Sequence, residues 1–302
     1  MYVNKNFFLK LFALFIILIL ADRVIGTILQ SSYLNAKYNR NYHTNYVVNK
    51  VNSDVLIFGA SRASHHYIPS ILSDSLKLSV FNCGNDGRNI YYYYGLLMII
   101  KERYLPRVII LDLSDTDFYV DRRYTIERVK KLAPYYGSNK DLDALINQIS
   151  SFEKFKMSSM LYRYNSRIID IIEDYLYKMD QNWENGYIPL GGQIKPVKNT
   201  KRYIEEKIID QRKISYIEKF ITFCKQNNIK VFICISPNYT CENYDYFIPI
   251  ENIAEKYNVP VFNHFCDPFF LKNNTLFKDE RHLNHDGAAA YSLIIGKELK
   301  IL

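Results

Sequence analysis

The chain lacks the cysteine spacing of a metal site. Its five cysteines form no Cys-x-x-Cys pair and stand at no metal-ligand spacing from histidine, which argues against zinc or any other bound metal. Cys83 and Cys234 lie in apolar stretches typical of strands, where a buried free thiol is the ordinary assignment. Cys241 and Cys266 are compatible with a disulfide in an oxidising compartment, although the sequence does not establish that pairing.

Long runs of basic residues, internal repeats and low-complexity tracts are also lacking. The net charge is +8, but the lysines and arginines are scattered, which favours a generally basic surface over a nucleic-acid site. Hydrophobic residues make up 48% of the chain and charged residues 23%, so a disordered or fibrous protein is excluded. At 302 residues, the chain is long enough for one large α/β domain with a buried core.

The N-terminus predicts a membrane anchor. Phe7–Ala21 reads FFLKLFALFIILILA, with Lys10 as its only charged residue. Its uninterrupted part is short for a span of ~20 residues, yet apolar residues resume over Val24–Leu29 and no small-x-small cleavage site follows. We therefore expect an uncleaved signal anchor over residues 1–30 rather than a cleaved peptide or a buried core helix. The N-terminal lysines favour a single-pass protein of the cytoplasmic membrane, with its main domain on the periplasmic or outer face.

Residues 54–302 predict a three-layer α/β/α domain with a central parallel sheet of about five strands, because short β-rich runs alternate with helical patterns. A linker over residues 31–53 would join it to the anchor. The expected strands are Val55–Phe58, Ser79–Asn82, Val108–Leu113, Lys230–Ile235 and Val261–Phe262. The expected helices are Pro69–Leu76, Ile90–Tyr104, Tyr203–Asn227, Ile248–Tyr257 and Gly287–Leu299. A helical and loop insertion at about 125–200 contains the sequence NGYIPLGG, whose glycines and proline indicate a structured loop.

A candidate nucleophile follows the first expected strand, in Gly59-Ala60-Ser61-Arg62. Ligands of open α/β sheets gather at the carboxyl ends of strands. A serine that follows a glycine able to turn tightly can begin the next helix with its hydroxyl exposed. The same pattern also fits a serine N-cap, and Ala63 replaces the second glycine of the G-x-S-x-G elbow of α/β-hydrolases.

A candidate base lies just ahead of the last expected helix, where Asp279 precedes His282 by three residues. Histidine can remove the proton of a serine hydroxyl, and a nearby carboxylate can hold the imidazole in the productive tautomer. A capping aspartate beside a surface histidine is the alternative. The coincidence with a serine at a strand end favours a catalytic triad of Ser61, His282 and Asp279.

These motifs, in this order, resemble those of the SGNH/GDSL hydrolases, especially the membrane-anchored SGNH-like proteins of bacterial envelope polysaccharide loci. The resemblance covers about residues 54–121 and 230–302. It implies a flavodoxin-like (SGNH) domain, with Ser61 as nucleophile, Asp279 and His282 as orienting group and base, and no cofactor. It also implies an oxyanion hole in which the backbone N–H of Ser61 is joined by that of Gly87 or, alternatively, Gly84, although either glycine could be a plain turn residue.

The third family motif departs from the pattern. The family places an oxyanion asparagine after the third strand, where this chain reads LDLSD over residues 111–115. Ser114 could donate a hydrogen bond there, whereas the Asp115 carboxylate would repel an oxyanion unless it points away. Asn85 could substitute as a donor. Ser114 and Asp115 are therefore candidate substrate-binding residues.

Three further polar residues follow the nucleophile. Arg62 could neutralise an anionic substrate or form a salt bridge with Asp86 or Asp115. His65 and His66, one helical turn on, could face the cleft, but such a pair is more often a surface or packing feature.

Together these patterns predict a serine-dependent esterase or O-acyltransferase that acts, through an acyl-enzyme, on O-acetyl groups of an envelope or extracellular polysaccharide. NGYIPLGG would form a substrate lid, the N-terminal helix would bind the membrane, and envelope acyltransferase proteins are candidate partners. No nucleic-acid partner is expected outside the cytoplasm. One alternative is a catalytically silent SGNH-fold protein for glycan binding or assembly, which the altered third motif supports. Another is a lipid esterase or thioesterase, which a deep apolar groove would favour over a polar, aromatic cleft.

Overall fold

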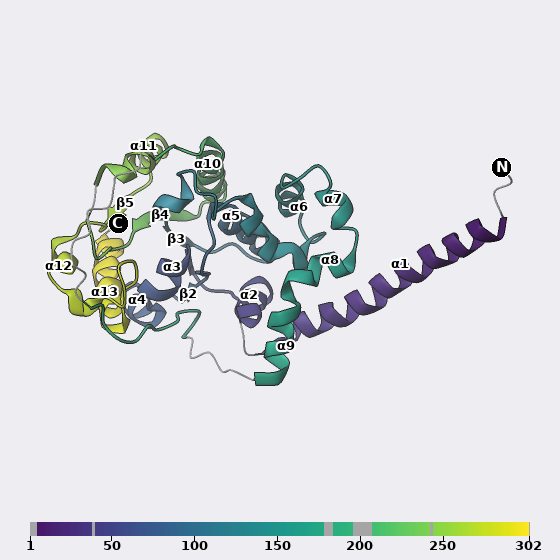
Figure 1. Ribbon diagram of the computed structural model, residues 1–302. Helices are drawn as coiled ribbons and strands as arrows, with labels where there is room; N and C mark the ends of the chain where they lie inside the picture. Colours follow the sequence, from purple (N-terminus) through teal and green to yellow (C-terminus); the bar gives the residue numbers. More distant parts are fainter. Residues whose placement is uncertain (1–4, 38–39, 178–183, 196–206, 242–243, 302) are drawn as a thin grey trace. The chain divides into compact units, whose positions relative to one another are not determined.

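The computed structural model describes residues 5–37, 40–177, 184–195, 207–241 and 244–301. The chain forms two compact units, and Figure 1 labels their elements. The first unit comprises Met1–Tyr46 and Lys130–Asp180. The second comprises Val47–Val129 and Gln181–Leu302.

The second unit is built on a five-stranded, all-parallel sheet with the strand order β2-β1-β3-β4-β5. Val55 of β1 lies opposite Val80 of β2 and Val108 of β3. This is the flavodoxin-like order. The chain first places β2 on one side of β1 and then crosses to the other side of β1 to form β3, so the switch point lies between β1 and β3. The predicted fold class and sheet are thus confirmed. The strands are β1 (Val55–Phe58), β2 (Val80–Asn82), β3 (Val108–Asp112), β4 (Lys230–Ile235) and β5 (Val261–Asn263).

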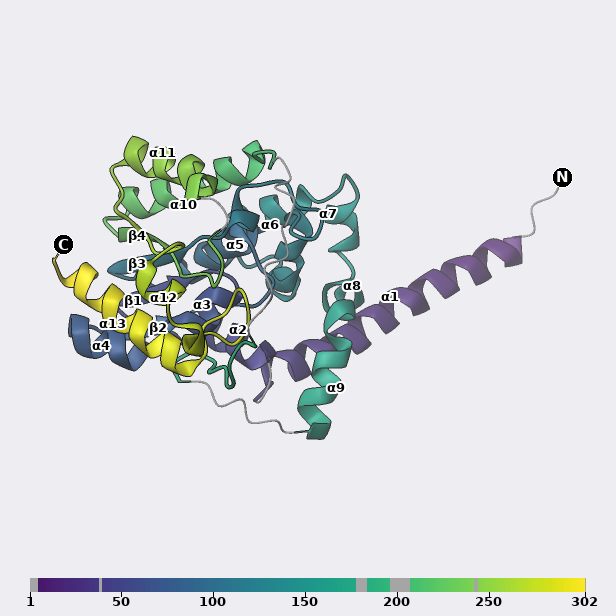
Figure 2. The same ribbon diagram turned by 60° about the vertical axis from the view of Figure 1, so that its left-hand side comes forward.

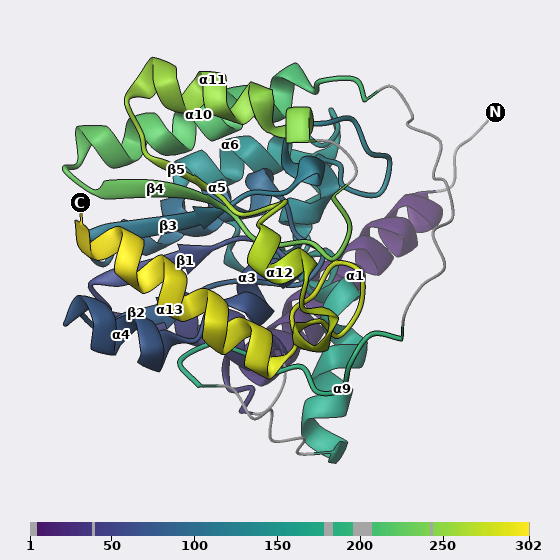
Figure 3. The same cartoon turned by 90° about the vertical axis from the view of Figure 1, so that its left-hand side faces the viewer.

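Helices cover both faces of this sheet (Figures 2 and 3). On one face lie α3 (Ser61–His66), α4 (Pro69–Leu76) and α13 (His285–Ile301). On the other lie α5 (Ile90–Ile100) and α10 (Gln211–Gln226), with α11 (Ile248–Tyr257) beside α10. The short elements are α12 (Pro268–Leu271) and the 3₁₀ turns η1 (Asp115–Asp117), η4 (Tyr244–Phe247) and η5 (Asn274–Leu276). The predicted helix over 203–227 begins only at Gln211, and residues 203–206 lie outside the described residues.

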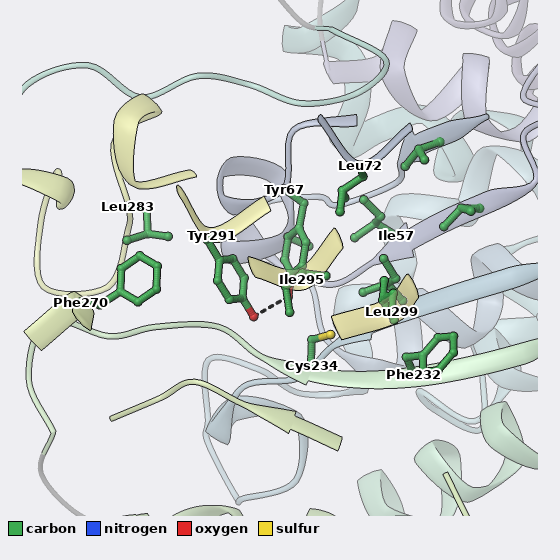
Figure 4. Packing of buried hydrophobic residues seen from close by; sticks show 14 of the residues in the cluster. Ile57, Tyr67, Leu72, Phe232, Cys234, Phe270, Leu283, Tyr291, Ile295 and Leu299 are labelled. Carbon is green, nitrogen blue, oxygen red and sulfur yellow. Dashed lines mark hydrogen bonds between the residues drawn. The ribbon is translucent and has the colours of Figure 1, made fainter. Parts of the chain in front are cut away.

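A buried pair of tyrosines lies in the core beneath α13 (Figure 4). Tyr67 and Tyr291 lie among apolar side chains of the sheet and of α13, and their hydroxyls are 3.4 Å apart. The Tyr67 hydroxyl donates to the Asp112 carboxylate over 2.6 Å, so its buried O–H group is satisfied. Asp112 is the last residue of β3, and the polar pair therefore lies at the carboxyl edge of the sheet.

All five cysteines lie in the second unit. Cys83, Cys224 and Cys234 are free and buried, as predicted for the first and last of them. Cys241 and Cys266 form a disulfide that links the segment after β4 to the segment after β5.

The first unit is helical. Its longest element, α1 (Lys5–Leu34), exposes its large apolar side chains from Phe7 to Leu20, each by 41–64%, and is long and apolar enough to cross a membrane. The other elements include η2 (Ile126–Tyr135), whose first residues belong to the second unit, and α2 (Arg40–Asn49), which ends in that unit. The rest are α6 (Lys140–Asn147), α7 (Glu153–Lys156), α8 (Met160–Tyr164), η3 (Asn165–Arg167) and α9 (Ile168–Tyr177).

The last part of α1 is fixed to α8. The Asp22 carboxylate accepts the backbone N–H groups of Met160 and Leu161, each over 3.0 Å, and the Ser159 hydroxyl over 2.5 Å. It thereby caps the first turn of α8. A side chain at Gly26 would place its Cβ 2.3 Å from the Met160 Cβ, so only glycine permits this approach.

Residues 31–53 contain regular structure where the sequence predicts a linker. Within this stretch α1 ends at Leu34 and α2 spans Arg40–Asn49. The Tyr135 hydroxyl donates to Asn45, and the Lys131 ammonium donates to Asn41 over 3.2 Å. The helical part of the predicted insertion joins α1 and α2 in the first unit. Hydrophobic periodicity gives no sign of this because distant polar groups make these contacts.

Candidate active site

Ser61 begins α3 directly after the turn that follows β1. Close packing explains the glycine in that turn, because a Cβ at Gly59 would lie 2.6 Å from the Ala63 Cβ and 2.9 Å from the Asp112 carbonyl oxygen. The backbone can therefore leave the strand and enter the helix within two residues. As the first residue of a helix, Ser61 has a backbone N–H with no acceptor inside that helix.

The three residues of the predicted triad lie within hydrogen-bonding distance of one another. Ser61 Oγ is 2.8 Å from His282 Nε2, and His282 Nδ1 is 3.0 Å from each carboxylate oxygen of Asp279. An ionised carboxylate only accepts hydrogen bonds, so Nδ1 carries the proton of the neutral imidazole. Nε2 is then free to accept the Ser61 hydroxyl proton.

A tight turn fixes the Asp279 carboxylate. Its Oδ1 accepts the backbone N–H groups of Arg281, over 2.8 Å, and His282, over 3.0 Å. Burial acts to raise the pKa of Asp279, but these hydrogen bonds and the adjacent imidazole outweigh it and hold that pKa below its usual value. Asp279 is therefore ionised at neutral pH.

The loop that carries His282 is held by α3. The backbone N–H of Leu283 donates to His66 Nε2 over 3.0 Å, and the rings of His66 and His282 meet edge to face at 6.2 Å. Burial, followed by the charges of His282 and Arg62, lowers the pKa of His66 well below its usual value. His66 is thus a neutral acceptor. His65 is also a packing residue, since its Nδ1 lies 2.7 Å from the Ile188 carbonyl oxygen.

The NGYIPLGG segment does not form a lid over the site, and that prediction is wrong. None of its residues lines the cleft. Its backbone instead joins the two halves of the site: Ile188 N–H donates to the Ser64 carbonyl over 3.0 Å, and His285 N–H donates to the Leu190 carbonyl over 2.9 Å. The segment therefore braces α3 against the His282 loop.

The third motif is built around internal hydrogen bonds. The hydroxyl and the backbone N–H of Ser114 both donate to Asp117 Oδ2 over 2.9 Å, so the serine is engaged in capping η1. Asp115 Oδ2 is 2.6 Å from the Lys207 ammonium. Burial acts to raise the pKa of Asp115, but Lys207 outweighs it and lowers that pKa. Sequence reasoning missed Lys207, which follows a stretch with no recognisable motif.

Gly84 and Gly87, the two candidate oxyanion glycines, differ in the partners of their backbone N–H groups. Gly84 N–H donates to Asn82 Oδ1 over 2.9 Å, and Asn85 N–H donates to the Gly59 carbonyl over 3.1 Å, so both groups are engaged. Gly87 has a φ of +67°, and its N–H has no acceptor among the residues that the structure describes. Gly84, Asn85 and Gly87 do not line the cleft, whereas Ser61 does.

Arg62 lies in the wall of the cleft and is largely buried. Its guanidinium donates to the Leu113 carbonyl over 3.3 Å, while Asp86 faces His65 and Asp115 pairs with Lys207. The salt bridges considered for Arg62 from the sequence are therefore not formed. Burial raises the pKa of Asp117 to about 6, although the hydrogen bonds from Ser114 and then the charges of Lys213 and Arg62 act to lower it.

Replacement of Asp117 by asparagine is expected to alter how stability depends on pH. A group whose pKa rises from 3.8 to about 6 on folding favours the folded state below pH 3.8 and loses that contribution as the pH rises through 6. The contribution of Asp117 to the free energy of unfolding therefore differs by at most about 3 kcal/mol between the two ends of this pH range. Relative to the parent protein, Asp117→Asn should therefore gain unfolding free energy between pH 4 and pH 7 in chemical denaturation. Asp74→Asn, at an exposed position of α4, is the control, and parallel pH curves for all three proteins would refute the expectation.

A cleft of about 860 Å³ opens beside Ser61 and His282. Lys207 lies over the Tyr246 ring, 4.0 Å from its centroid, and the Cys241–Cys266 disulfide ties together two loops that contribute to the walls. The aromatic side chains of the lining are Tyr119, Tyr124, Tyr246, Phe247 and Phe265. Its polar side chains include Asp115, Asp121, Arg123, Lys207, Asn238, Glu280 and Arg281. The cleft is thus polar and aromatic rather than a deep apolar groove.

Comparisons with known proteins do not assign this chain to a family. No model of a known protein family matches the sequence, and no curated protein matches it. Among solved structures, an acetyl xylan esterase aligns with 81% of this chain and 97% of its own, at 14% identity and a TM-score of 0.39. A likeness at that TM-score assigns neither a fold nor an activity to this chain.

Proposed function

We propose that the protein is a serine-dependent esterase or O-acyltransferase. The observation that carries the proposal is the hydrogen-bonded series Ser61–His282–Asp279, which lies at the carboxyl edge of a parallel sheet and opens into a cleft. A hydroxyl, a neutral imidazole and an ionised carboxylate in this order form a nucleophile, a base and an orienting group. The resemblance of the sequence motifs to those of SGNH/GDSL hydrolases supports the same roles.

The reaction has two halves. Ser61 Oγ attacks the ester carbonyl carbon while His282 Nε2 takes the hydroxyl proton, and Asp279 stabilises the resulting imidazolium. The leaving alcohol then receives that proton, which leaves an acyl-enzyme on Ser61. In the second half, water or a sugar hydroxyl attacks this ester and loses its proton to His282, which passes the proton to Ser61 Oγ as the bond between Oγ and the acyl carbon breaks. The backbone N–H of Ser61 is the donor to the oxyanion that lies in the cleft, and Gly87 N–H could join it only if the turn that carries Gly87 moved toward the cleft.

An O-acetylated carbohydrate is the substrate class that we propose. The cleft offers aromatic rings on which sugar faces can pack, together with charged and amide groups that can bind hydroxyls. A lipid ester would require an extended apolar groove, so the lining does not favour the lipid esterase alternative. The experiment is to measure acetate release from aryl acetates and acetyl transfer from them to oligosaccharides. Release without transfer would identify a hydrolase, and faster turnover with an acceptor would identify a transferase.

One observation favours a second candidate, a catalytically silent carbohydrate-binding or assembly protein. The Ser114 hydroxyl is engaged with Asp117, so the third motif offers no side-chain donor to an oxyanion from that residue. Loss of one such donor costs about 10²–10³ in rate. Oligosaccharide binding without acetate release would support this candidate.

We also propose that α1 anchors the protein in the cytoplasmic membrane, with the second unit outside. The exposed apolar surface of α1 requires a non-aqueous environment, and Lys5 and Lys10 favour a cytoplasmic N-terminus. The Cys241–Cys266 disulfide is consistent with an oxidising compartment.

Topology can be read from a reporter. Alkaline phosphatase folds to its active form only outside the cytoplasm of a bacterial host, so fusion after residue 302 should give active enzyme. A fusion after Lys5, ahead of the apolar run, should be inactive. An inactive fusion at the C-terminus, with the full-length protein present in the membrane, would contradict the proposed orientation.

A further inference from the structure

Two phenylalanines of the first unit protrude into solvent at α7. The Phe152 side chain is 69% exposed and that of Phe155 is 78% exposed, the highest value among the large apolar residues that the structure describes. Lys154, between them in sequence, is also exposed. Exposed phenylalanine rings are costly in water, and phenylalanine together with lysine is typical of segments that lie in the boundary between lipid headgroups and acyl chains.

This tip, residues 152–155, is held in place by a buried carboxylate. Glu153 has no exposed side-chain surface and faces two ammonium groups, that of Lys156 at 3.2 Å and that of Lys130 at 3.4 Å. The hydroxyls of Ser150 and Tyr162 also donate to it, over 3.0 and 2.8 Å. With Glu153 directed inward, Phe152 and Phe155 are directed outward, so their exposure results from a defined local structure.

The tip lies close to the end of the apolar run of α1. Asp22, the first charged residue after Phe7–Ala21, accepts the hydroxyl of Ser159. Ser159 follows Phe155 by four residues, which span at most roughly 14 Å even when fully extended. The intervening backbone is folded, since Ser158 N–H donates to the Phe155 carbonyl over 3.1 Å. The phenylalanines are therefore near Asp22, where α1 would enter the boundary region, and the exposed Val24, Ile25 and Ile28 of α1 would lie in the same region.

Another exposed apolar face of the first unit lies farther along α1. Ile169, 71% exposed, belongs to α9, which follows α8. The end of α8 contacts α1 at Tyr33, where the rings of Tyr33 and Tyr164 are 5.7 Å apart. Eleven residues of helix, or roughly 16 Å, separate Tyr33 from Asp22. Ile169 thus serves as a matched control, with similar exposure but a position beyond the boundary region.

We propose that the tip inserts into the interfacial region of the lipid bilayer beside α1. Phe152 and Phe155 enter the boundary between headgroups and acyl chains, and Lys154 faces anionic headgroups. The inference rests on the proposed anchoring by α1. It adds a second, shallow membrane contact that fixes the first unit against the surface instead of leaving it to rotate about a single helix.

Tryptophan fluorescence of the full-length chain in vesicles tests this contact. In a Trp183→Phe background, Phe155→Trp, Ile169→Trp and Leu18→Trp each introduce a single tryptophan, and Phe152→Trp repeats the test at the second ring. The vesicles contain phosphatidylcholine and phosphatidylglycerol, with or without lipid brominated near the headgroup end of its acyl chains. We expect blue-shifted emission and loss of intensity with brominated lipid for the tryptophans at 18, 152 and 155, and neither effect at 169.

The outcomes separate the two proposals. An unquenched tryptophan at position 18 would show that α1 does not insert, and the anchor itself would fail. Quenching at position 18, with unquenched and solvent-exposed tryptophans at 152 and 155, would overturn the tip inference alone. Blue-shifted but unquenched emission at 152 and 155 would also overturn it, because a protein surface would then cover the rings. Circular dichroism of each variant verifies that the exposed substitutions leave the helical content unchanged.

Discussion

Replacement of Ser61 by alanine is expected to lower the turnover of aryl acetates by on the order of 10⁴-fold or more. The variant loses the atom that forms the acyl-enzyme, and the imidazole of His282 can then only assist direct attack by water. The Ser61 hydroxyl has one described side-chain partner, His282 Nε2 at 2.8 Å, so its removal should leave the fold unchanged. Initial rates at saturating ester, with protein concentration determined independently, provide the measurement.

A second serine, Ser70, provides the matched control for the loss of turnover in Ser61→Ala. Ser70 lies exposed in the first turn of α4, and Ser70→Ala should retain the parent rate within about twofold because surface changes of this kind have small effects. If Ser61→Ala and the parent protein release acetate at the same trace rate, the silent carbohydrate-binding candidate becomes the better account.

The Asp279→Asn variant should lose on the order of 10⁴-fold in kcat, with a small change in KM. The asparagine oxygen can still accept the N–H groups of Arg281 and His282, so the turn survives. Its amide group, however, donates toward His282 Nδ1 and drives the imidazole proton to Nε2. The imidazole then presents a donor to Ser61 where an acceptor is required.

Asp286→Asn is the control for this variant because Asp286 is exposed in the first turn of α13, just beyond the same loop. It should match the parent protein in kcat. A kcat for Asp279→Asn within tenfold of the parent value would remove Asp279 from the proposed triad.

The fold could be predicted because the buried strands are continuous apolar runs separated by helical patterns. Two helix predictions, Pro69–Leu76 and Ile248–Tyr257, match the structure at both ends. Each has a proline in its first turn, where the missing N–H carries no penalty, and each is followed by a residue with positive φ, Lys77 or Asn258. The prolines and Asn258 are local signals that can be read from the sequence, whereas the positive φ of Lys77 is not.

The first unit could not be predicted in the same way. Asp22 caps a helix that begins at Met160, and Asn41 and Asn45 bind residues that lie ninety positions away. Single polar contacts between distant segments leave no period in the sequence. A stretch without apolar periodicity therefore predicts a linker, although long-range contacts order it.

The candidate site likewise contains residues that a sequence motif identifies and residues that only the folded structure identifies. Ser61 could be identified because it closely follows a strand, and Asp279 and His282 because they lie three residues apart ahead of the last helix. Lys207, which neutralises Asp115, and His66, which binds the backbone after His282, act through folded geometry and carry no motif. The glycines of NGYIPLGG predict a structured loop, and the partners of this segment are the backbones of α3 and of the His282 loop rather than a substrate.

Covalent labelling can show whether Ser61 is a nucleophile toward an acyl centre. The full-length protein is treated with a fluorophosphonate ester, and the intact protein and its peptides are analysed by mass spectrometry. We expect one adduct, located on Ser61, that is absent from Ser61→Ala and forms much more slowly in Asp279→Asn. An unmodified protein, or an adduct on another residue with Ser61 intact, would contradict it.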